Sequence, residues 1–312
     1  MGAKQCPAGC KKRTPINQMQ RNMPMYIRKF KQEDLCRIEQ IHSFLAVQIK
    51  YHNGIRNENI VCVIKDEMII GIGFLIIHQT RNLQKTEVTY SASPDGDSKY
   101  NKKIRDLLMD GLLKRFRELK EENPNSHYYL RICCDTEETE EMQALLKKGF
   151  AIWRAIPVLK YDLSQEILHY KIPENIHIAK YCFDERSMDK YLKADFSAST
   201  ELDSEADLWF QTGNPGFACY TAVCDGEIAG AVSVWDISDG RGATENIFVV
   251  PEYRRKNIAR ELIATALEDL KERNRTMATL SVIGTNGKAI MLYLSCGYTL
   301  YYNLIEMIYE HG

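Results

Sequence analysis

Apolar positions along this 312-residue chain recur with two periods, every second residue as in a strand and every third or fourth residue as in a helix. The two patterns alternate along the chain, which predicts an α/β fold with a mixed sheet. In the first half, strands are expected at 26–30, 60–64, 68–77, 86–90 and 128–133, with a strand pair within 152–161. Helices are expected up to about residue 55, at 102–121, and in a segment ending at Gly149-Phe150.

The second half repeats this order of elements. Strands are expected at 176–179, 220–224, 227–235 and 243–249, at 277–283, and again within 298–309. Helices are expected at 184–198 and 206–212, and after residues 257 and 286. The segment Leu145 to Phe150 also aligns with Tyr293 to Tyr298, and Ile70-Gly71 aligns with Ala229-Gly230. A tandem duplication is the simplest explanation of this repetition.

The duplication predicts two domains, at 25–162 and 176–312, joined by a polar linker at 163–175. Residues 1–24 are rich in Lys, Arg, Gln, Asn and Pro and show no periodicity, so we expect a flexible leader there.

Composition limits the partners of the protein. The formal net charge of -1 provides no general attraction for nucleic acid or an anionic membrane. No apolar run reaches about 18 residues and the N-terminus lacks the apolar core of a secretion signal, so we expect a cytoplasmic protein with no membrane contact. Cys6 and Cys10 have no second Cys/His pair nearby, so we predict no metal site. A monomer or a homodimer is expected.

The most informative segment runs from Asn246 to Ala259, where a β-branched strand leads into a cationic turn that begins an amphipathic helix. Such a turn directs backbone N–H groups and the positive helix end toward an anion, and basic side chains add charge. The residues expected to hold a diphosphate there are Arg254, Arg255, Lys256, Asn257, Ile258 and Ala259.

A second segment, Asn286 to Tyr298, predicts a short helix that ends at Gly297 and is followed by a strand. Asn286 stands at the start of this helix, where its side chain is expected to act as an N-cap, with a possible second role in binding a cofactor.

Together the two segments resemble the GNAT superfamily of acyl-CoA-dependent N-acyltransferases. The first is similar to the family's Arg/Gln-x-x-Gly-x-Gly/Ala loop, and the second to its Asn-x-x-Ala-x-x-Leu-Tyr-x-x-x-Gly-Phe/Tyr helix. Asn257 departs from the pattern because the family prefers glycine there. Asparagine is among the few residues that tolerate a positive φ.

The resemblance implies an acetyl-CoA-dependent N-acetyltransferase, in which a primary amine of a small molecule or peptide attacks the thioester directly in a ternary complex. It implies that the main chain of Ile247, Phe248 and Val249 pairs with the pantetheine arm. It also implies that the Tyr293 hydroxyl gives a proton to the departing sulfur, which suits a group with a pKa of about 10. A tyrosine that only packs in the core is the alternative.

The amine must lose a proton before it attacks, so a base is needed. We expect Glu245 in this role because alternation along the strand places it on the same face as Ile247, although a surface glutamate is the alternative. Asp236 and Asp239 are reserve candidates. Acidic and aromatic residues near the expected acceptor groove suit a cationic amine or simply form a solvated helix face: Glu201, Asp203, Glu205, Asp207, Trp209 and Phe210.

The first copy lacks these features. It has Leu145 in place of Tyr293, and the segment Ser91 to Lys99 brings Asp95 and Asp97 to the place of the cationic turn. We expect the first copy to be silent and to act as a scaffold, as a wall of the acceptor site or in the manner of a dimer partner. A catalytically silent acyl-CoA-binding protein is the alternative function for the whole chain.

Overall fold

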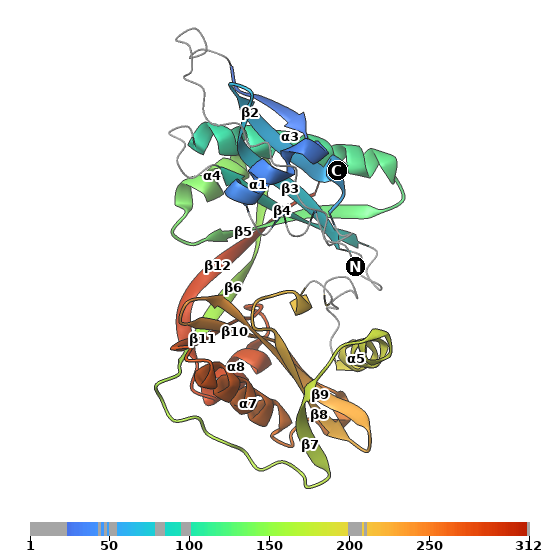
Figure 1. Ribbon diagram of the computed structural model, residues 1–312, viewed down its shortest axis with the longest axis vertical. Helices are drawn as coiled ribbons and strands as arrows, with labels where there is room; N and C mark the ends of the chain where they lie inside the picture. The colour runs from blue at the N-terminus through green and yellow to red at the C-terminus, as the bar shows by residue number, and fades with distance from the viewer. Residues whose placement is uncertain are drawn as a thin grey trace.

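The computed structural model describes residues 24–42, 45–46, 49, 55–78, 85–94, 101–198, 208 and 211–310. Helices and strands alternate in both halves, in the same order (Figure 1). The first half contains β1 (Tyr26–Lys29), α1 (Leu35–Ile41), β2 (Ile60–Lys65), β3 (Met68–His78), β4 (Lys85–Pro94), α3 (Asn101–Glu122), β5 (His127–Asp135), α4 (Thr139–Lys147) and β6 (Ala151–Asp162). The second half contains β7 (Ile176–Tyr181), α5 (Glu185–Ala198), β8 (Ala218–Cys224), β9 (Glu227–Ser238), β10 (Arg241–Val249), α7 (Ile258–Glu272), β11 (Met277–Ser281), α8 (Gly287–Ser295) and β12 (Thr299–Tyr309).

The predicted α/β fold with a mixed sheet is confirmed, and one detail of the strand prediction is wrong. The segments 152–161 and 298–309 each form one long strand rather than several. Each strand contains a β-bulge, at Trp153 and at Tyr301, where the register between β6 and β12 shifts. An extra residue in a strand interrupts the alternation of its side chains, and this break imitates a strand boundary in the sequence. The predicted helix at 206–212 and all of the predicted leader except Pro24 lie outside the described residues, apart from positions 208, 211 and 212.

The described strands form one sheet in the order β1-β2-β3-β4-β5-β12-β6-β11-β10-β9-β8-β7. The last strands of the two halves are therefore exchanged: β12 pairs with β5 of the first half, and β6 pairs with β11 of the second half. In Figure 1 these two long strands run side by side between the halves.

Two aromatic side chains complete equivalent packing sites across the exchange. Tyr161 of β6 lies against Gly297, and Tyr309 of β12 lies against Gly149. Both glycines have a φ of 94°, which a residue with a Cβ rarely adopts. The sites are thus equivalent in the two halves, and each is filled by the strand of the other half.

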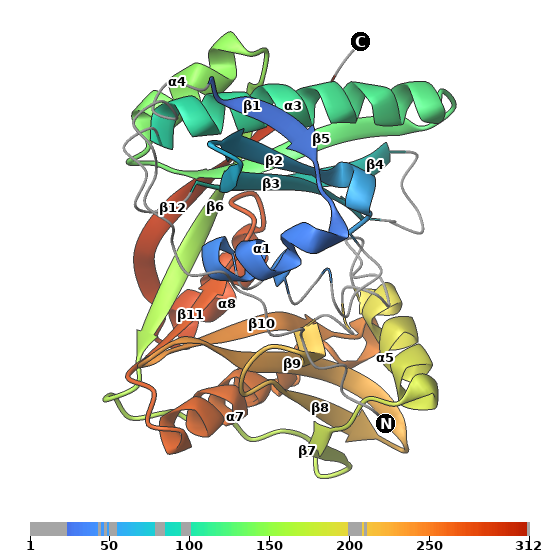
Figure 2. The same cartoon turned by 45° about the horizontal axis from the view of Figure 1, so that its top comes forward.

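The sheet has two different faces, which we call outer and inner. The outer face is covered by α3 in the first half, through Leu108 and Leu112, and by α7 in the second half, through Leu262 and Leu270. The inner face is covered in part by α1 and by α5. In Figure 2, α3 and α7 lie at the top and bottom of the molecule, α1 lies between the halves, and α5 lies at the side of the second half. Within the described residues, no helix is both long enough and apolar enough to cross a bilayer.

Candidate active site

The strands β10 and β11 are parallel neighbours for only a short distance. Their pairing covers Arg241 to Ala243 on β10 and Met277 to Thr279 on β11. Beyond this point in the described chain, β11 and the residues after it follow β6, since Val282 N–H donates to Pro157 O (3.0 Å). Among the residues that the structure describes, the edge of β10 from Thr244 onward therefore has no partner strand on the β11 side. We call this divergence of β10 from β11 the splay. An extended ligand can pair with a strand edge of this kind.

Glu245 lies at the point where the two strands separate. Its Oε1 atom accepts hydrogen bonds from the backbone N–H of Ser281 (3.0 Å) and from the Ser281 hydroxyl (3.1 Å). The carboxylate thus spans the beginning of the splay, and the structure brings it close enough to Tyr293 to affect the pKa of that residue.

The expectation that Glu245 shares a face with Ile247 is wrong. A β-bulge between Glu245 and Phe248 inserts one extra residue opposite β9, and Asn246 has a φ of 52°. Because the bulge shifts the alternation, Phe248 packs on the inner face against Tyr191 of α5, whereas Ile247 packs on the outer core with α7. Glu245 shares its face with Phe248.

The turn between β10 and α7 is built around left-handed backbone conformations. A 3-10 turn at Pro251–Tyr253 is followed by Arg254 in an extended conformation, Arg255 with a φ of 62° and Asn257 with a φ of 61°. Asn257 therefore adopts the conformation for which glycine is preferred, as the sequence allowed. Its side chain makes no capping bond and instead accepts from Arg260 (3.1 Å). The N–H groups of the first turn of α7 remain directed at the loop.

The basic residues of this turn have different environments. Arg254 donates to two backbone carbonyls, Val249 O (3.0 Å) and Ala198 O (2.8 Å), so its guanidinium ties the loop to the end of α5. Arg255 and Lys256 are exposed, and Lys256 Nζ lies 5.3 Å from the centre of the Tyr253 ring. These two side chains are the predicted cations that extend into solvent.

Sequence analysis missed Arg260, one turn further along. Its guanidinium contacts Asn257 and the Ser295 hydroxyl (3.2 Å), and it lies 5.5 Å from the ring of Tyr170. It therefore connects the start of α7 with the end of α8. The sequence did contain a signal for Arg260, since it is a basic residue directly after the loop pattern that ends at Ala259.

Helix α8 places Tyr293 against the core beside the splay. Asn286 Oδ1 accepts from Ala289 N–H (3.2 Å), which confirms the predicted N-cap. Tyr293 is 8% exposed, and its ring lies 6.2 Å from that of Tyr298. Burial, followed by the negative charge of Glu245, raises the pKa of Tyr293 above its usual value. The phenol is thus protonated at neutral pH, as a proton donor must be.

The other candidates are placed as follows. Asp236 forms a two-pronged ion pair with Arg275 (3.0 and 2.9 Å), at the end of β9 away from Glu245. The acidic and aromatic residues predicted near the acceptor groove, 201–207 and 209–210, lie outside the described residues, as does most of the first-half segment Ser91 to Lys99 beyond Pro94.

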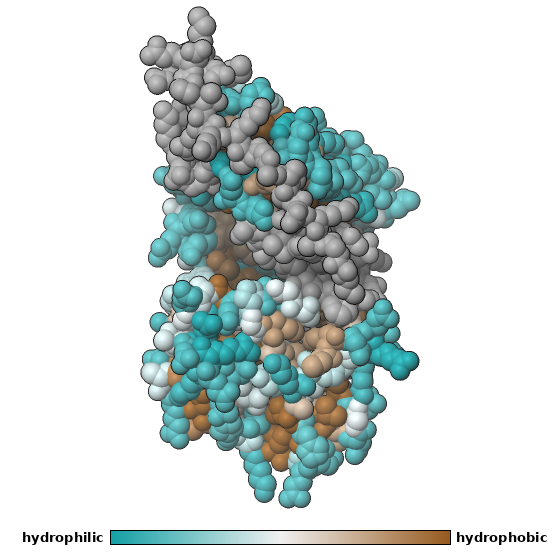
Figure 3. Space-filling model, in the orientation of Figure 1, coloured by the Kyte–Doolittle hydropathy of each residue, from teal (hydrophilic) through white to brown (hydrophobic). Residues whose placement is uncertain are grey.

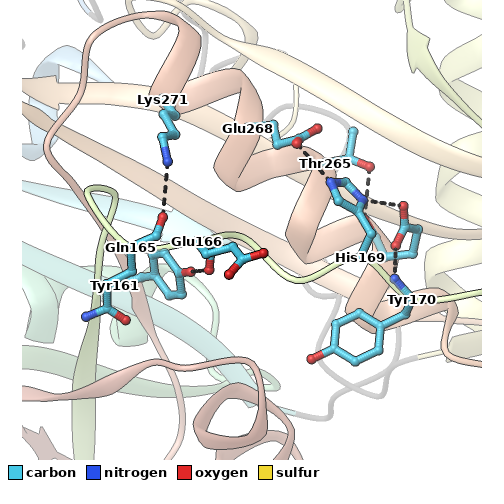
Figure 4. A network of polar contacts seen from close by, with 9 residues as sticks. Tyr161, Gln165, Glu166, His169, Tyr170, Thr265, Glu268 and Lys271 are labelled. Carbon is cyan, nitrogen blue, oxygen red and sulfur yellow. Dashed lines mark hydrogen bonds and ion pairs between the residues drawn. The ribbon is translucent and has the colours of Figure 1, made fainter.

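The predicted linker is packed along α7 (Figure 4). Tyr161 donates to Glu166 O (2.8 Å) and Lys271 donates to Gln165 O (3.0 Å). The two ring nitrogens of His169 face Glu261 (2.9 Å) and Glu268 (2.8 Å). Two carboxylates require two N–H donors, so the imidazole is doubly protonated in this arrangement. These bonds raise the pKa of His169.

Comparison with known proteins agrees with this geometry. Residues 183–298 match the sequence profile of the Acetyltransferase (GNAT) family. We refer to this matched region, which lies in the second half of the chain, as the GNAT domain. No curated protein sequence gives a significant match. The matched region contains the splay, the cationic turn and Tyr293.

Solved structures resemble the whole chain in fold. A GCN5-related N-acetyltransferase from Sphaerobacter thermophilus is 15% identical, with 93% of this chain and 97% of the other covered and a TM-score of 0.63. A tandem GNAT protein from the clavulanic acid biosynthesis pathway is 12% identical, with 93% and 99% covered and a TM-score of 0.65. A putative acetyltransferase from Pyrococcus horikoshii is 11% identical, with 94% and 92% covered and a TM-score of 0.55. The two halves therefore form a tandem GNAT fold.

The two halves differ where the GNAT domain has Tyr293. Leu145 occupies the equivalent position in α4, since Phe150 N–H bonds to Leu145 O and Tyr298 N–H bonds to Tyr293 O, both at 3.1 Å. Leu145 is 2% exposed and carries no proton to donate. The equivalent place in the first half thus lacks the acid that the GNAT domain has.

Proposed function

We propose that the GNAT domain transfers an acetyl group from acetyl-CoA to a primary amine, by direct attack within a ternary complex. Proteins with this fold are generally acyltransferases. The observation that carries the proposal is the convergence of three groups at one place: the unpaired edge of β10, the Glu245 carboxylate and the Tyr293 phenol.

The loop before α7 would hold the diphosphate of the cofactor. The N–H groups of its left-handed residues and of the first turn of α7 supply donors, and Arg255 and Lys256 supply mobile positive charge. Arg260 lies beside these groups and adds a third cation. Arg254 would act on the loop rather than on the phosphates, since it bonds to backbone carbonyls.

The edge of β10 at Ile247 to Val249 would pair with the pantetheine arm, and a backbone N–H there would polarise the thioester carbonyl. The pairing of β10 with β9 holds this N–H in a fixed position. The N–H can therefore polarise the carbonyl without reorganising during the reaction.

Proton transfer would involve two residues. An ammonium with a pKa of about 10.4 pays roughly 4 to 5 kcal/mol to lose its proton at pH 7. Glu245 would accept this proton, directly or through water. The amine nitrogen then bonds to the carbonyl carbon as the carbon–sulfur bond breaks, and Tyr293 gives its proton to the sulfur. The nitrogen carries one extra proton after its attack and loses it to solvent, solvent returns a proton to Tyr293, and Glu245 releases the proton that it accepted.

Thiol release from acetyl-CoA, measured with a panel of amines, polyamines, aminoglycosides and peptides, tests the proposal. Loss of a general acid lowers turnover about 100-fold or more. We therefore expect Tyr293→Phe to reduce kcat by this factor, with unchanged acetyl-CoA binding. Tyr26→Phe is the matched control, because Tyr26 is 48% exposed on the edge strand of the first half.

Glu245→Gln should lower the rate most at low pH, where the amine is most protonated.

The alternative is a silent acyl-CoA-binding protein. The small exposed fraction of Tyr293 and the use of Arg254 within the protein favour it. Binding of acetyl-CoA without thiol release for any acceptor would establish the alternative and reject the transferase.

A further inference from the structure

Two charged side chains of β10 lie on the inner face of the sheet, one on each side of Ala243. Gly242 faces the outer helix α7, since a Cβ there would meet a Leu270 methyl at 2.3 Å. Alternation along the strand therefore directs Arg241, Ala243 and Glu245 to the inner face. A cation and the proposed base thus face the same side of β10, with only a methyl side chain between them.

The Arg241 side chain is held by the neighbouring strand β11. Its Nε atom donates to the Thr279 hydroxyl (3.1 Å). That hydroxyl in turn donates to Gly242 O (3.4 Å), so the guanidinium is attached to a group that is itself fixed. Within the described residues, Arg241 forms no ion pair. A guanidinium held through Nε keeps its two terminal NH2 groups for an anion such as a carboxylate.

A second cation belongs to the first half of the chain. Lys160 of the exchanged strand β6 lies directly opposite Thr279, and residues opposite each other in a sheet share a face. Its Nζ atom lies 4.8 Å from the centre of the Tyr301 ring of β12. Figure 3 shows a recess between the halves, near where these two strands run in Figure 1. Thr279 thus has a cation from each of its neighbouring strands beside it.

Two carboxylates lie near these cations without pairing with them. Asp162, two residues beyond Lys160 on the same face of β6, accepts a hydrogen bond from the Ser164 N–H (2.9 Å) in the following turn. Asp239 lies in the turn between β9 and β10 and is exposed. Across the described part of the chain, neither forms an ion pair with Arg241 or Lys160. Exposed carboxylates are screened by solvent, so both cations can still attract an anionic ligand.

The surface between Glu245 and Arg241 is apolar. Trp235 of β9 lies opposite Ala243, so it shares the inner face, and its side chain is half-buried there. A flat indole beside a small residue suits the carbon stem of a ligand whose two ends are charged.

The spacing of the two charged groups can be measured along β11, because each of them contacts a residue of that strand. Glu245 accepts hydrogen bonds from Ser281, and Arg241 donates to Thr279. These two residues of β11 are two positions apart and a strand rises about 3.3 Å per residue, so the two contacts lie roughly 7 Å apart. An ion pair requires about 4 Å or less. The gap is therefore too wide for a direct pair and short enough for a small molecule to bridge.

We propose that the acceptor is a short amino acid, bound with its amine at Glu245 and its carboxylate at Arg241, with Lys160 as the second cation at the carboxylate end. This inference rests on the proposed acetyl transfer. It makes Arg241 and Lys160 specificity residues, and Lys160 comes from the half that lacks the catalytic tyrosine.

Glycine, β-alanine, 4-aminobutyrate and 6-aminohexanoate, each beside its own carboxamide, test the length and the charge in the thiol-release assay. We expect kcat/KM to be highest for β-alanine or 4-aminobutyrate, since glycine is shorter than the gap and 6-aminohexanoate is longer. The acid should exceed its amide at least about tenfold, through KM, because a charge-assisted bond to the guanidinium is lost in the amide.

Variants of Arg241 test the assignment of the carboxylate. Arg241→Gln should remove most of the preference for the acid while kcat for the amides is retained, Arg241→Lys should keep part of it, and Lys160→Gln should weaken it less. The ratio of acid to amide is compared between variants, so differences in amine basicity cancel. Arg105→Gln, on α3 of the outer face, is the matched control.

Reversal of the charge gives a result that loss of folding cannot produce. Arg241→Glu should accept 1,4-diaminobutane better than 4-aminobutyrate, whereas the unaltered protein should show the opposite order. All variants are melted beside the unaltered protein.

Equal kcat/KM for acids and amides at every length, a maximum at 6-aminohexanoate, or an acid preference that survives in Arg241→Gln would overturn this inference and leave acetyl transfer intact. Absence of thiol release with every acceptor would instead reject the proposed function, and this inference with it.

Discussion

Separating the two halves should unfold both of them, because each half of the sheet contains a strand that belongs to the other half. We consider a chain opened between Glu174 and Asn175, both exposed, to give fragments 1–174 and 175–312. The second fragment contains all the sequence of the GNAT domain but lacks β6, which separates β11 from β12 in the sheet.

The missing burial is large compared with the stability of a domain. Ile156, Val158, Leu159 and Tyr161 of β6 are 8%, 4%, 2% and 3% exposed. Burial of such side chains contributes about 1.5 to 3 kcal/mol each, so the fragment loses about 6 to 12 kcal/mol before its broken backbone pairing is counted. A domain is stable by about 5 to 15 kcal/mol.

The assay compares the fragments expressed alone, the fragments expressed together, and the intact chain cut by a protease at an inserted site. Circular dichroism should show no cooperative melt for either fragment alone. The fragments expressed together and the cut chain should elute as one complex and release thiol at a similar rate. A monomeric fragment 175–312 with a cooperative melt would refute the reasoning, since β12 would then have replaced β6 beside β11.

Three smaller predictions concern single positions. Asn257→Ala should lower stability by about 1 kcal/mol in thermal unfolding, because alanine tolerates a φ of 61° poorly, whereas Asn257→Gly should not. Gly242→Val should cost about 1 to 3 kcal/mol, because a Cβ there meets a Leu270 methyl at 2.3 Å; the control Gly287→Ala, with no atom within 4 Å, should be nearly neutral in the same melts. The raised pKa of His169 means that its bonds stabilise the fold fully below about pH 6.5 and less as the pH rises through the folded-state pKa. Because His169 is exposed, His169→Gln should cost only about 0.2 to 1 kcal/mol in urea unfolding at pH 5.5 and nothing at pH 9; an equal loss at both would contradict the charge assignment.

Local sequence was sufficient for the order of elements but not for the pairing of the last strands. The alternation of apolar and polar side chains and the turn residues are patterns of neighbouring positions in the chain. They were therefore enough to predict the order of elements in both halves. The choice between β6 and β12 as the partner of β11 depends on equivalent contacts, since Tyr161 and Tyr309 fill equivalent sites at Gly297 and Gly149. No local pattern distinguishes two such strands, and only the three-dimensional arrangement does.

The same limit applies to the candidate site. The N-cap at Asn286 was predicted from the residue type, and the positive φ of Asn257 is one that asparagine tolerates. The bulge at Asn246 was not, because an asparagine within a strand pattern also occurs without a bulge. The contacts of His169 with α7 join positions 92 and 99 residues apart, so the 163–175 segment resembled a plain linker.

The exchange gives the first half a direct part in the geometry of the second. Val158 of β6 lies opposite Ser281, whose N–H and hydroxyl hold the Glu245 carboxylate. The backbone beyond β11 also follows β6, through Gly284 N–H and Ala155 O (2.9 Å), before Asn286 begins α8 and so fixes the position of Tyr293. The candidate base and the candidate acid are therefore both positioned through a strand that belongs to the other repeat. A first half that has Leu145 in place of a tyrosine still shapes the site, because what it contributes is β6.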